Sequence, residues 1–281
     1  MQTVSGMALN RAHSMDPTSH FPSRPKILFL DIGDTILGWS HQAKSEAARK
    51  ISEAKGQIFD IDNFDHATCM VWKNRNGASL KDVITQQQEF EYWLDFYTEL
   101  LELVDIANPP ANLVESLARL PVTPDTFTLF NDTLYMLKNA HKQGIRLGAI
   151  SNAFISVQGI FTALQLQGVF EPLILSYQVG VAKPQPEIYH IALKEAKVSP
   201  QDACFVDDRP IFVEAALKEK MSAVLLDREN VHASEKLVRI HSLSALESIW
   251  KTPNHTIPNH HDPKGAYKHA NQFMEPNWVK R

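Results

Sequence analysis

Short apolar runs that stop abruptly at polar residues restrict the fold of this chain more than any other feature. The first run, Ile27 to Leu30, ends at Asp31 and is followed by the turn-forming residues Gly33 and Asp34. Such a run predicts a buried strand, and glycine and aspartate favour the turn that ends it. The carboxyl ends of buried parallel strands are the places where open α/β sheets bind their ligands. Asp31 is therefore a candidate for the chemistry of this chain.

From residue 121 onward, further apolar runs alternate with segments that have the spacing of helices. This alternation is typical of a parallel sheet covered by helices on both faces, so we predict an α/β fold with a Rossmann-like, three-layer core. The predicted strands are 26–31, 145–150, 173–175, 203–206 and 222–226, with an edge strand at 238–240. The predicted helices of the core are 131–142, 155–166, 186–196, 213–220 and 245–250.

Residues 39–120 have a different pattern. Apolar and aromatic side chains between Val83 and Leu101 recur at spacings of about three and four, which is typical of one face of a helix. The segment shows no strand-like alternation, so we predict a helical cap inserted after the first strand. Its predicted helices are 43–54, 80–104 and 113–120, and the core then consists of residues 25–38 and 121–250.

The two ends of the chain are polar, and we predict a disordered leader over residues 1–24 and a poorly ordered tail over residues 251–281. The leader lacks the apolar centre of a secretory signal. Its single acid, Asp16, among several Ser and Arg residues leaves an organelle transit peptide as an alternative. A metal site in the tail is disfavoured because no Cys or acid cluster completes the ligand set of its histidines, His255, His260, His261 and His269.

Composition narrows the class of protein. A chain of 281 residues with 44% hydrophobic and 21% charged residues is ordinary for a soluble protein with one large domain, or with a core and an insert. The net charge of −4 gives no electrostatic argument for binding nucleic acid or an anionic membrane. Cys69 and Cys204 lie far apart and form no metal motif, so we expect reduced thiols in a cytoplasmic protein.

Polar groups follow the predicted strands at Asp31, at Ser151 and at the pair Asp207-Asp208, and Lys183 lies in a loop. In a parallel sheet these ends meet at one edge. An acid nucleophile, a hydroxyl donor, a fixed cation and paired acids are what phosphoryl transfer through an aspartyl-phosphate requires. Carboxylate oxygens suit Mg²⁺, a hard cation. The sequence thus indicates a site for a divalent ion and a transferable phosphoryl group.

Four segments carry a family resemblance. They are Leu-Asp-Ile-Gly-Asp-Thr at 30–35, Ala-Ile-Ser-Asn at 149–152, Lys-Pro-Gln-Pro-Glu-Ile-Tyr at 183–189 and Phe-Val-Asp-Asp at 205–208. In order, spacing and strand context they resemble the four motifs of the haloacid dehalogenase superfamily of aspartate-nucleophile phosphatases. The resemblance covers about residues 25 to 250, including the cap.

The resemblance implies a role for each matching position. The catalytic residues would be Asp31, the nucleophile, together with Ser151 and Lys183. The phosphoryl group would be bound by Ser151, Asn152 and Lys183. The Mg²⁺ ion would be held by Asp31, the carbonyl oxygen of Gly33, and Asp207 or Asp208. The substrate would be a small phosphorylated metabolite, and the cap would exclude water and select it.

One position departs from the family pattern. Most phosphatases of the family carry a second Asp two residues after the nucleophile as general acid and base, and here that residue is Gly33. Asp34 is adjacent, but in an extended strand end its side chain faces away from Asp31 unless a turn redirects it. The enzyme then uses substrates with good leaving groups, such as acyl phosphates or sugar 1-phosphates, or receives the proton from another group.

Two alternatives to a Mg²⁺-dependent phosphatase stay open from the sequence. In a haloacid dehalogenase Asp31 attacks carbon without a metal, and the acid pair Asp207-Asp208 argues against this because it suits a cation. A catalytically silent phosphate-binding or regulatory protein is the other alternative, and Gly33 is its main support.

Overall fold

The structure is a computed structural model that describes residues 24–75, 77–233 and 236–251. Its core is a parallel six-stranded sheet in the order β5-β4-β1-β6-β7-β8. The strands are β1 (Ile27–Leu30), β4 (Arg146–Ser151), β5 (Leu173–Leu175), β6 (Ala203–Asp207), β7 (Ser222–Leu226) and β8 (Arg239–Ile240). In the register, Leu30 lies between Ala149 of β4 and Val206 of β6. The carboxyl ends of the first, second and fourth sequence motifs are therefore brought to one edge.

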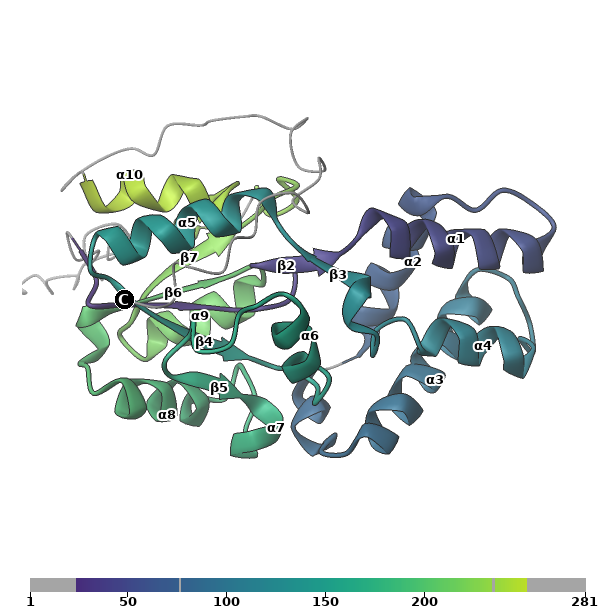
Figure 1. The fold of residues 1–281 in the computed structure, drawn as a ribbon, viewed down its shortest axis with the longest axis horizontal. Coiled ribbons are helices and arrows are strands. Elements are labelled where there is room, and N and C mark those ends of the chain that lie inside the picture. The colour runs from purple at the N-terminus through teal and green to yellow at the C-terminus, as the bar shows by residue number, and fades with distance from the viewer. Residues whose placement is uncertain (1–23, 76, 234–235, 252–281) are drawn as a thin grey trace, which may run out of the picture.

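Helices cover both faces of this sheet (Figure 1). The fully buried strand β1 sends alternate side chains to opposite faces, as a strand must. Leu28 and Leu30 join one apolar cluster, and Ile27 and Phe29 join the other. The core helices are α5 (Asn131–Lys142), α6 (Val157–Ala163), α7 (Ser176–Val179), α8 (Pro186–Ala196), α9 (Pro210–Lys218) and α10 (Leu246–Lys251).

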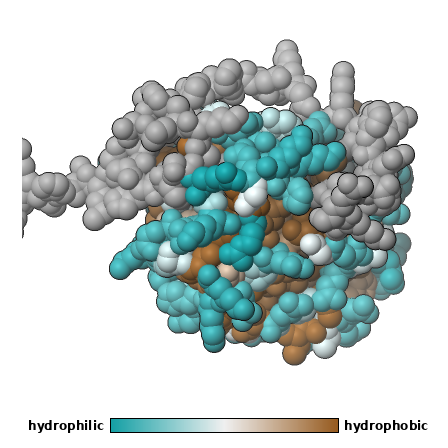
Figure 2. Space-filling view, turned by 60° about the vertical axis from the view of Figure 1, so that its left-hand side comes forward, coloured by the Kyte–Doolittle hydropathy of each residue, from teal (hydrophilic) through white to brown (hydrophobic). Residues whose placement is uncertain are grey.

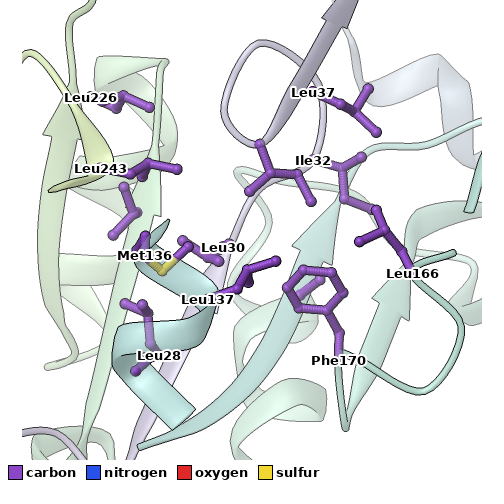
Figure 3. Close-up of a cluster of buried hydrophobic side chains, with 14 of the residues drawn as sticks. Leu28, Leu30, Ile32, Leu37, Met136, Leu137, Leu166, Phe170, Leu226 and Leu243 are labelled. Atoms are coloured by element: carbon purple, nitrogen blue, oxygen red, sulfur yellow. The ribbon is translucent and has the colours of Figure 1, made fainter. Parts of the chain in front are cut away.

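The first of these clusters lies between the sheet and α5. Figure 3 shows Leu28 and Leu30 of β1 close to Met136 and Leu137 of α5. Leu28, Leu30 and Leu137 are completely buried. The second cluster contains Ile188 of α8 and Val213 of α9. Short 3₁₀ turns join several elements: η1 (Gly77–Asp82), η2 (Pro124–Thr126), η3 (Pro200–Asp202) and η4 (Leu243–Ala245).

A group of four helices, here called the helical insert, interrupts the core between β2 (Leu37–Trp39) and β3 (Phe127–Leu129). These two strands pair antiparallel and form a two-stranded ribbon. Figure 1 shows the insert to one side of the sheet, joined to it by this ribbon. Its own apolar cluster includes Phe96, Tyr97 and Leu100. The helices are α1 (His41–Lys55), α2 (Ile61–Asn74), α3 (Gln86–Leu103) and α4 (Ala111–Ala118).

The predicted α/β class and the Rossmann-like parallel core are confirmed, but local details of the insert differ from the prediction. The sequence analysis missed α2 and the ribbon, and it began the long helix at residue 80 instead of Gln86. Both helix starts carry a capping box, in which Asp60 pairs with Asn63 and Thr85 with Gln88. Those local signals were available and outweigh the apolar periodicity. The predicted leader and tail lie outside the described residues, apart from Arg24 and Lys251.

Within the described ranges, no helix combines the length and apolarity needed to cross a bilayer. Figure 2 shows hydrophilic side chains spread over one side of the molecule, with apolar areas between them. Cys69 is exposed and Cys204 is buried, and both are free thiols.

Candidate active site

The turn after β1 places Asp31 at the edge of the sheet. The Asp31 N–H donates to the Val206 carbonyl at 2.9 Å, so the main chain continues the strand pairing up to this residue. The N–H groups of Ile36 and Leu37 then donate back to the Ile32 carbonyl, which closes a tight turn. Asp31 is therefore the last residue held by the sheet, and the residue is 7% exposed.

Lys183 connects two of the predicted acids. Its Nζ donates to Asp31 Oδ1 at 2.5 Å and to Asp207 Oδ2 at 2.6 Å. Lys183 is 1% exposed and Asp207 is completely buried. The other oxygen of Asp207 accepts the Arg209 N–H at 2.9 Å. Charges that are removed from water need this kind of pairing and hydrogen bonding, and here residues from three different segments supply it.

The charged groups of this site shift one another's pKa values. Burial by itself lowers the pKa of Lys183, but the charges of Asp207 and Asp31 and the hydrogen bonds to them outweigh it, and the net effect raises that pKa. Burial raises the pKa of Asp207, and Asp31 adds to this while Lys183 opposes it. The Lys183 ammonium is thus held as a fixed cation between two carboxylates.

Asn152 fixes the loop that carries Lys183. Its Oδ1 accepts the Lys183 N–H at 2.7 Å, and its Nδ2 donates to the Lys183 carbonyl at 2.9 Å. Because the Asn152 side chain is engaged in this pair, contact between Asn152 and a phosphoryl group is left to its main-chain N–H. Ser151, the last residue of β4, is 4% exposed. The second and third sequence motifs are therefore held together by hydrogen bonds between the Asn152 side chain and the Lys183 main chain.

Asp208 and Asp34 join Asp31 and Asp207 in a group of four acids, here called the acidic rim. The pKa of Asp208 is raised well above its usual range. The largest cause is burial, and the neighbouring charges of Asp207, Asp34 and Asp31 add to it. The sequence analysis expected strand alternation to turn the Asp34 side chain away from Asp31 unless a turn redirected it. However, β1 ends at Leu30, and Asp34 lies in the following turn with a left-handed φ of 55°. Strand alternation therefore does not apply at Asp34, and its charge acts on the acidic cluster.

A divalent cation fits this rim by charge and by donor type. Four acids, Asp31, Asp34, Asp207 and Asp208, lie here against the ammonium groups of Lys183 and Lys44. In the described part of the chain, no three His, Cys, Asp or Glu side chains are grouped so as to hold a metal by themselves. Mg²⁺ needs no such group, because it is usually bound by one or two carboxylates and keeps several waters. Asp31, the Gly33 carbonyl, and Asp207 or Asp208 are the oxygen donors that would hold it.

Gly33 leaves open space at the position of the usual second acid. The residue is exposed, and a Cβ atom built on it would meet nothing within 4 Å. Its φ lies outside the left-handed region, so a side chain can be placed there without backbone strain. The departure from the family pattern is therefore a missing side chain and not a blocked site.

The sequence analysis missed a buried acid that joins the helical insert to the core. Glu89 of α3 is 1% exposed. Its Oε2 accepts the Ser156 N–H at 3.0 Å, and its Oε1 accepts the Ser156 hydroxyl at 2.5 Å. The indole N–H of Trp93 lies 3.5 Å from Oε1. The position of Glu89 on the face of α3 that carries Trp93 and Phe96 indicates burial, but the sequence does not indicate its partner Ser156.

Burial of Glu89 gives a prediction about pH. Burial raises the pKa of its carboxyl above the ordinary 4.5, against the opposing hydrogen bonds from Ser156 and Trp93. Between the ordinary and the raised pKa the folded protein binds more protons than the unfolded chain, so this residue makes stability fall as pH rises through that window. In Glu89→Gln this contribution is gone. The stability of the variant relative to wild type should therefore increase with pH.

Urea unfolding of wild type and Glu89→Gln in a pH series from about 4 to 8 measures this difference. Other titrating groups affect both proteins equally and cancel in the comparison. A difference that is constant across the series, or that falls with pH, would contradict a raised pKa at Glu89.

Comparisons with known proteins identify the family of this chain. The family model described as "Hydrolase: haloacid dehalogenase-like hydrolase" matches residues 25–218, which is more than half of the chain and spans the four motifs. "Haloacid dehalogenase-like hydrolase domain-containing protein 3" of Bos taurus is 25% identical over 189 residues, covering 65% of this chain and 74% of that protein. "Glyceraldehyde 3-phosphate phosphatase" of Pyrococcus furiosus is 28% identical over 192 residues, covering 66% and 73%.

"Phosphatase MT3486" of Mycobacterium tuberculosis is 26% identical over 176 residues, covering 62% of this chain and 76% of that protein. Solved structures share the fold. An L-2-haloacid dehalogenase, RSc1362, aligns with a TM-score of 0.60 at 16% identity over 82% of this chain and all of that chain. A haloacid dehalogenase-type phosphatase from Thermococcus onnurineus aligns with a TM-score of 0.52 at 20% identity, over 79% and 96%. The chain is a hydrolase that belongs to the haloacid dehalogenase-like family.

Proposed function

We propose that this hydrolase is a Mg²⁺-dependent phosphatase of small phosphorylated metabolites, with Asp31 as the nucleophile. The observation that carries the proposal is the buried pair of hydrogen bonds from Lys183 Nζ to Asp31 and Asp207. A fixed cation beside an acid at the end of a central strand suits attack on phosphorus, because it offsets charge on the phosphoryl oxygens. The two relatives named as phosphatases support this choice.

In the proposed reaction an Asp31 oxygen attacks phosphorus. Because Lys183 holds Oδ1, we assign the attack to Oδ2. The new bond joins Asp31 to phosphorus while the bond from phosphorus to the leaving oxygen breaks. Water then attacks the phosphorus of the aspartyl-phosphate, which releases phosphate and restores the carboxylate. Ser151 and the main-chain N–H of Asn152 would hold the phosphoryl oxygens. Mg²⁺, bound at the acidic rim, would neutralise charge on them.

The leaving oxygen needs a proton when it departs from an alkyl ester, and Gly33 cannot supply one. We therefore propose substrates whose leaving groups depart without strong acid assistance, such as acyl phosphates or sugar 1-phosphates. Both cysteines are free thiols, which fits the cytoplasmic location that we propose.

A phosphatase screen tests the proposal. The full chain should release phosphate from acetyl phosphate or p-nitrophenyl phosphate in the presence of MgCl₂ and lose this activity in EDTA. The (S)-2-haloacid dehalogenase 4A of Burkholderia cepacia is also a relative, at 23% identity over 192 residues, so 2-chloropropionate belongs in the screen. Halide release without metal would replace the proposal by a dehalogenase. Binding of phosphate with no turnover of any compound would replace it by a silent protein.

Gly33→Asp should increase the rate for a poor leaving group. The open space at Gly33 accommodates the new side chain, which would supply the missing acid. General acid catalysis is worth about 10²–10⁴-fold, so we expect a gain of about 10² or more in kcat for an alkyl phosphate and a small change for acetyl phosphate. Gly33→Asn is the matched control because it fills the same space without an acid. Equal rates in the two variants would show that no proton was missing.

A further inference from the structure

Glu89 joins the helical insert to a core segment next to the candidate active site. The carboxylate belongs to α3 of the helical insert, and Ser156 belongs to the core segment between β4 and α6. Both donors of Ser156, the main-chain N–H and the hydroxyl, reach Glu89. Ser156 lies five residues after Ser151 in the printed sequence. The insert is therefore bonded to the same segment that supplies the predicted phosphate-binding groups.

Aromatic side chains surround this polar contact. The Phe154 ring, two residues before Ser156, lies 4.9 Å from the Trp93 ring and 5.0 Å from the Tyr92 ring, both in α3. Arg75 lies over Tyr92 at 5.1 Å and pairs with Glu99. Burial raises the pKa of Glu89, and the groups that oppose this shift, Ser156 and Trp93, carry no charge. The carboxylate is held by hydrogen bonds inside an apolar shell.

A buried acid in such surroundings stabilises folding less than an apolar side chain of the same volume would. The carboxylate nevertheless accepts from three donors, the N–H and hydroxyl of Ser156 and the indole N–H of Trp93, and these can fix its position. Hydrogen bonds act over a narrow range of distance and angle, whereas aromatic packing tolerates sliding. The carboxylate therefore fixes the register of the insert on the core more closely than the rings alone.

The segment between β4 and α6 is held from two sides. On the core side, Asn152 exchanges two hydrogen bonds with the main chain of Lys183. On the insert side, Ser156 donates twice to Glu89. A movement of the insert that kept the Glu89 contact would pull on Asn152, and through it on the Lys183 loop.

We infer that Glu89 is a positioning residue that locks the helical insert to the 151–156 segment and so keeps Asn152 and the Lys183 loop in register for the reaction. The inference rests on the proposed function only for its effect on turnover. It predicts that removing the carboxylate loosens the Lys183 loop as well as the segment that Glu89 touches.

Hydrogen exchange measured by mass spectrometry tests this on the full chain without any substrate. In Glu89→Ala, we expect amide exchange to rise about tenfold or more in 152–160, and also to rise in 182–185, because the two hydrogen bonds that Ser156 donates to Glu89 are lost. Glu89→Gln keeps one acceptor and should restore most of the protection. Asp95→Ala is the matched control, since Asp95 is an exposed acid on the same helix.

Steady-state kinetics with acetyl phosphate and MgCl₂ give the second readout. We expect kcat of Glu89→Ala to fall about tenfold or more with a smaller change in KM, Glu89→Gln to recover most of it, and Asp95→Ala to match wild type. Ser156→Ala removes the hydroxyl from the other side. Combined with Glu89→Ala it should cost little more than Glu89→Ala alone, because both act on one contact.

Unchanged exchange in 182–185 in Glu89→Ala would overturn the inference, even if 152–160 exchanged faster, because the effect would then be local. Wild-type kcat in an otherwise folded Glu89→Ala would overturn it as well. A wild-type protein without hydrolysis would refute the proposed function. In that case the exchange at 182–185 still decides the positioning role by itself.

Discussion

Asp31→Asn is expected to abolish phosphate release, by at least about 10⁴-fold in kcat, because the amide cannot act as the nucleophile that forms the aspartyl-phosphate. The change is nearly isosteric, and the Asn carbonyl oxygen can still accept the hydrogen bond that Lys183 donates to Asp31 Oδ1 at 2.5 Å. The fold should therefore persist. Phosphate release by purified wild type and variant at saturating acetyl phosphate and MgCl₂ measures the effect.

The comparison needs a control for the loss of one negative charge at the acidic rim. Asp62→Asn serves, since Asp62 is an exposed acid on α2 of the helical insert, outside the cluster. Thermal unfolding of both variants establishes that each is folded. Substantial turnover by a folded Asp31→Asn would exclude Asp31 as nucleophile and would point to direct attack by water.

Lys183→Met is expected to have the largest effect on stability. Lys183 is 1% exposed and bonds to both Asp31 and Asp207, so its removal leaves two neighbouring buried or nearly buried carboxylates without their cation. Breaking a buried charge pair by removing one partner costs about 3–5 kcal/mol. We expect a decrease of this size in the free energy of unfolding, together with loss of activity, because the phosphoryl charge is no longer offset.

Urea unfolding of wild type, Lys183→Met and the control Lys194→Met measures this decrease. Lys194 is an exposed residue of the nearby helix α8, and its replacement should change stability by about 0.5 kcal/mol or less. If Lys183→Met unfolds at the same urea concentration as the control, the ammonium does not compensate the two carboxylates as the geometry indicates.

The sequence predicted the core because one feature, an apolar run that stops at a polar residue, indicates both a buried strand and a candidate site residue at its end. Apolar runs that are buried in the sheet stop near the ends of the strands, and the next residue in three of them is Asp31, Ser151 or Asp207. Parallel pairing then places these ends together without further information. The observed register, with Leu30 between Ala149 and Val206, is the result of that rule.

What the sequence analysis missed depends on contacts between distant segments. The bond from Glu89 to Ser156 joins residues 67 positions apart, and neither residue has a neighbour in sequence that announces the pair. Asn152 was predicted as a phosphate-binding residue, and the sequence did not indicate that its side chain also holds the main chain of Lys183. Asp34 was expected to follow the alternation of a strand that in fact ends at Leu30. Local patterns do not specify which distant segments come into contact.

Chemical trapping of the intermediate tests the central claim most directly. The full chain is mixed with acetyl phosphate and MgCl₂ and then treated with borohydride, which reduces an aspartyl-phosphate to homoserine. Fragmentation of the peptide that begins at Ile27 distinguishes the two acids of this motif. We predict reduction at Asp31, and none in Asp31→Asn or in EDTA. Phosphate release with no reduction at Asp31, or with reduction at Asp34 instead, would contradict the assignment of Asp31 as the nucleophile.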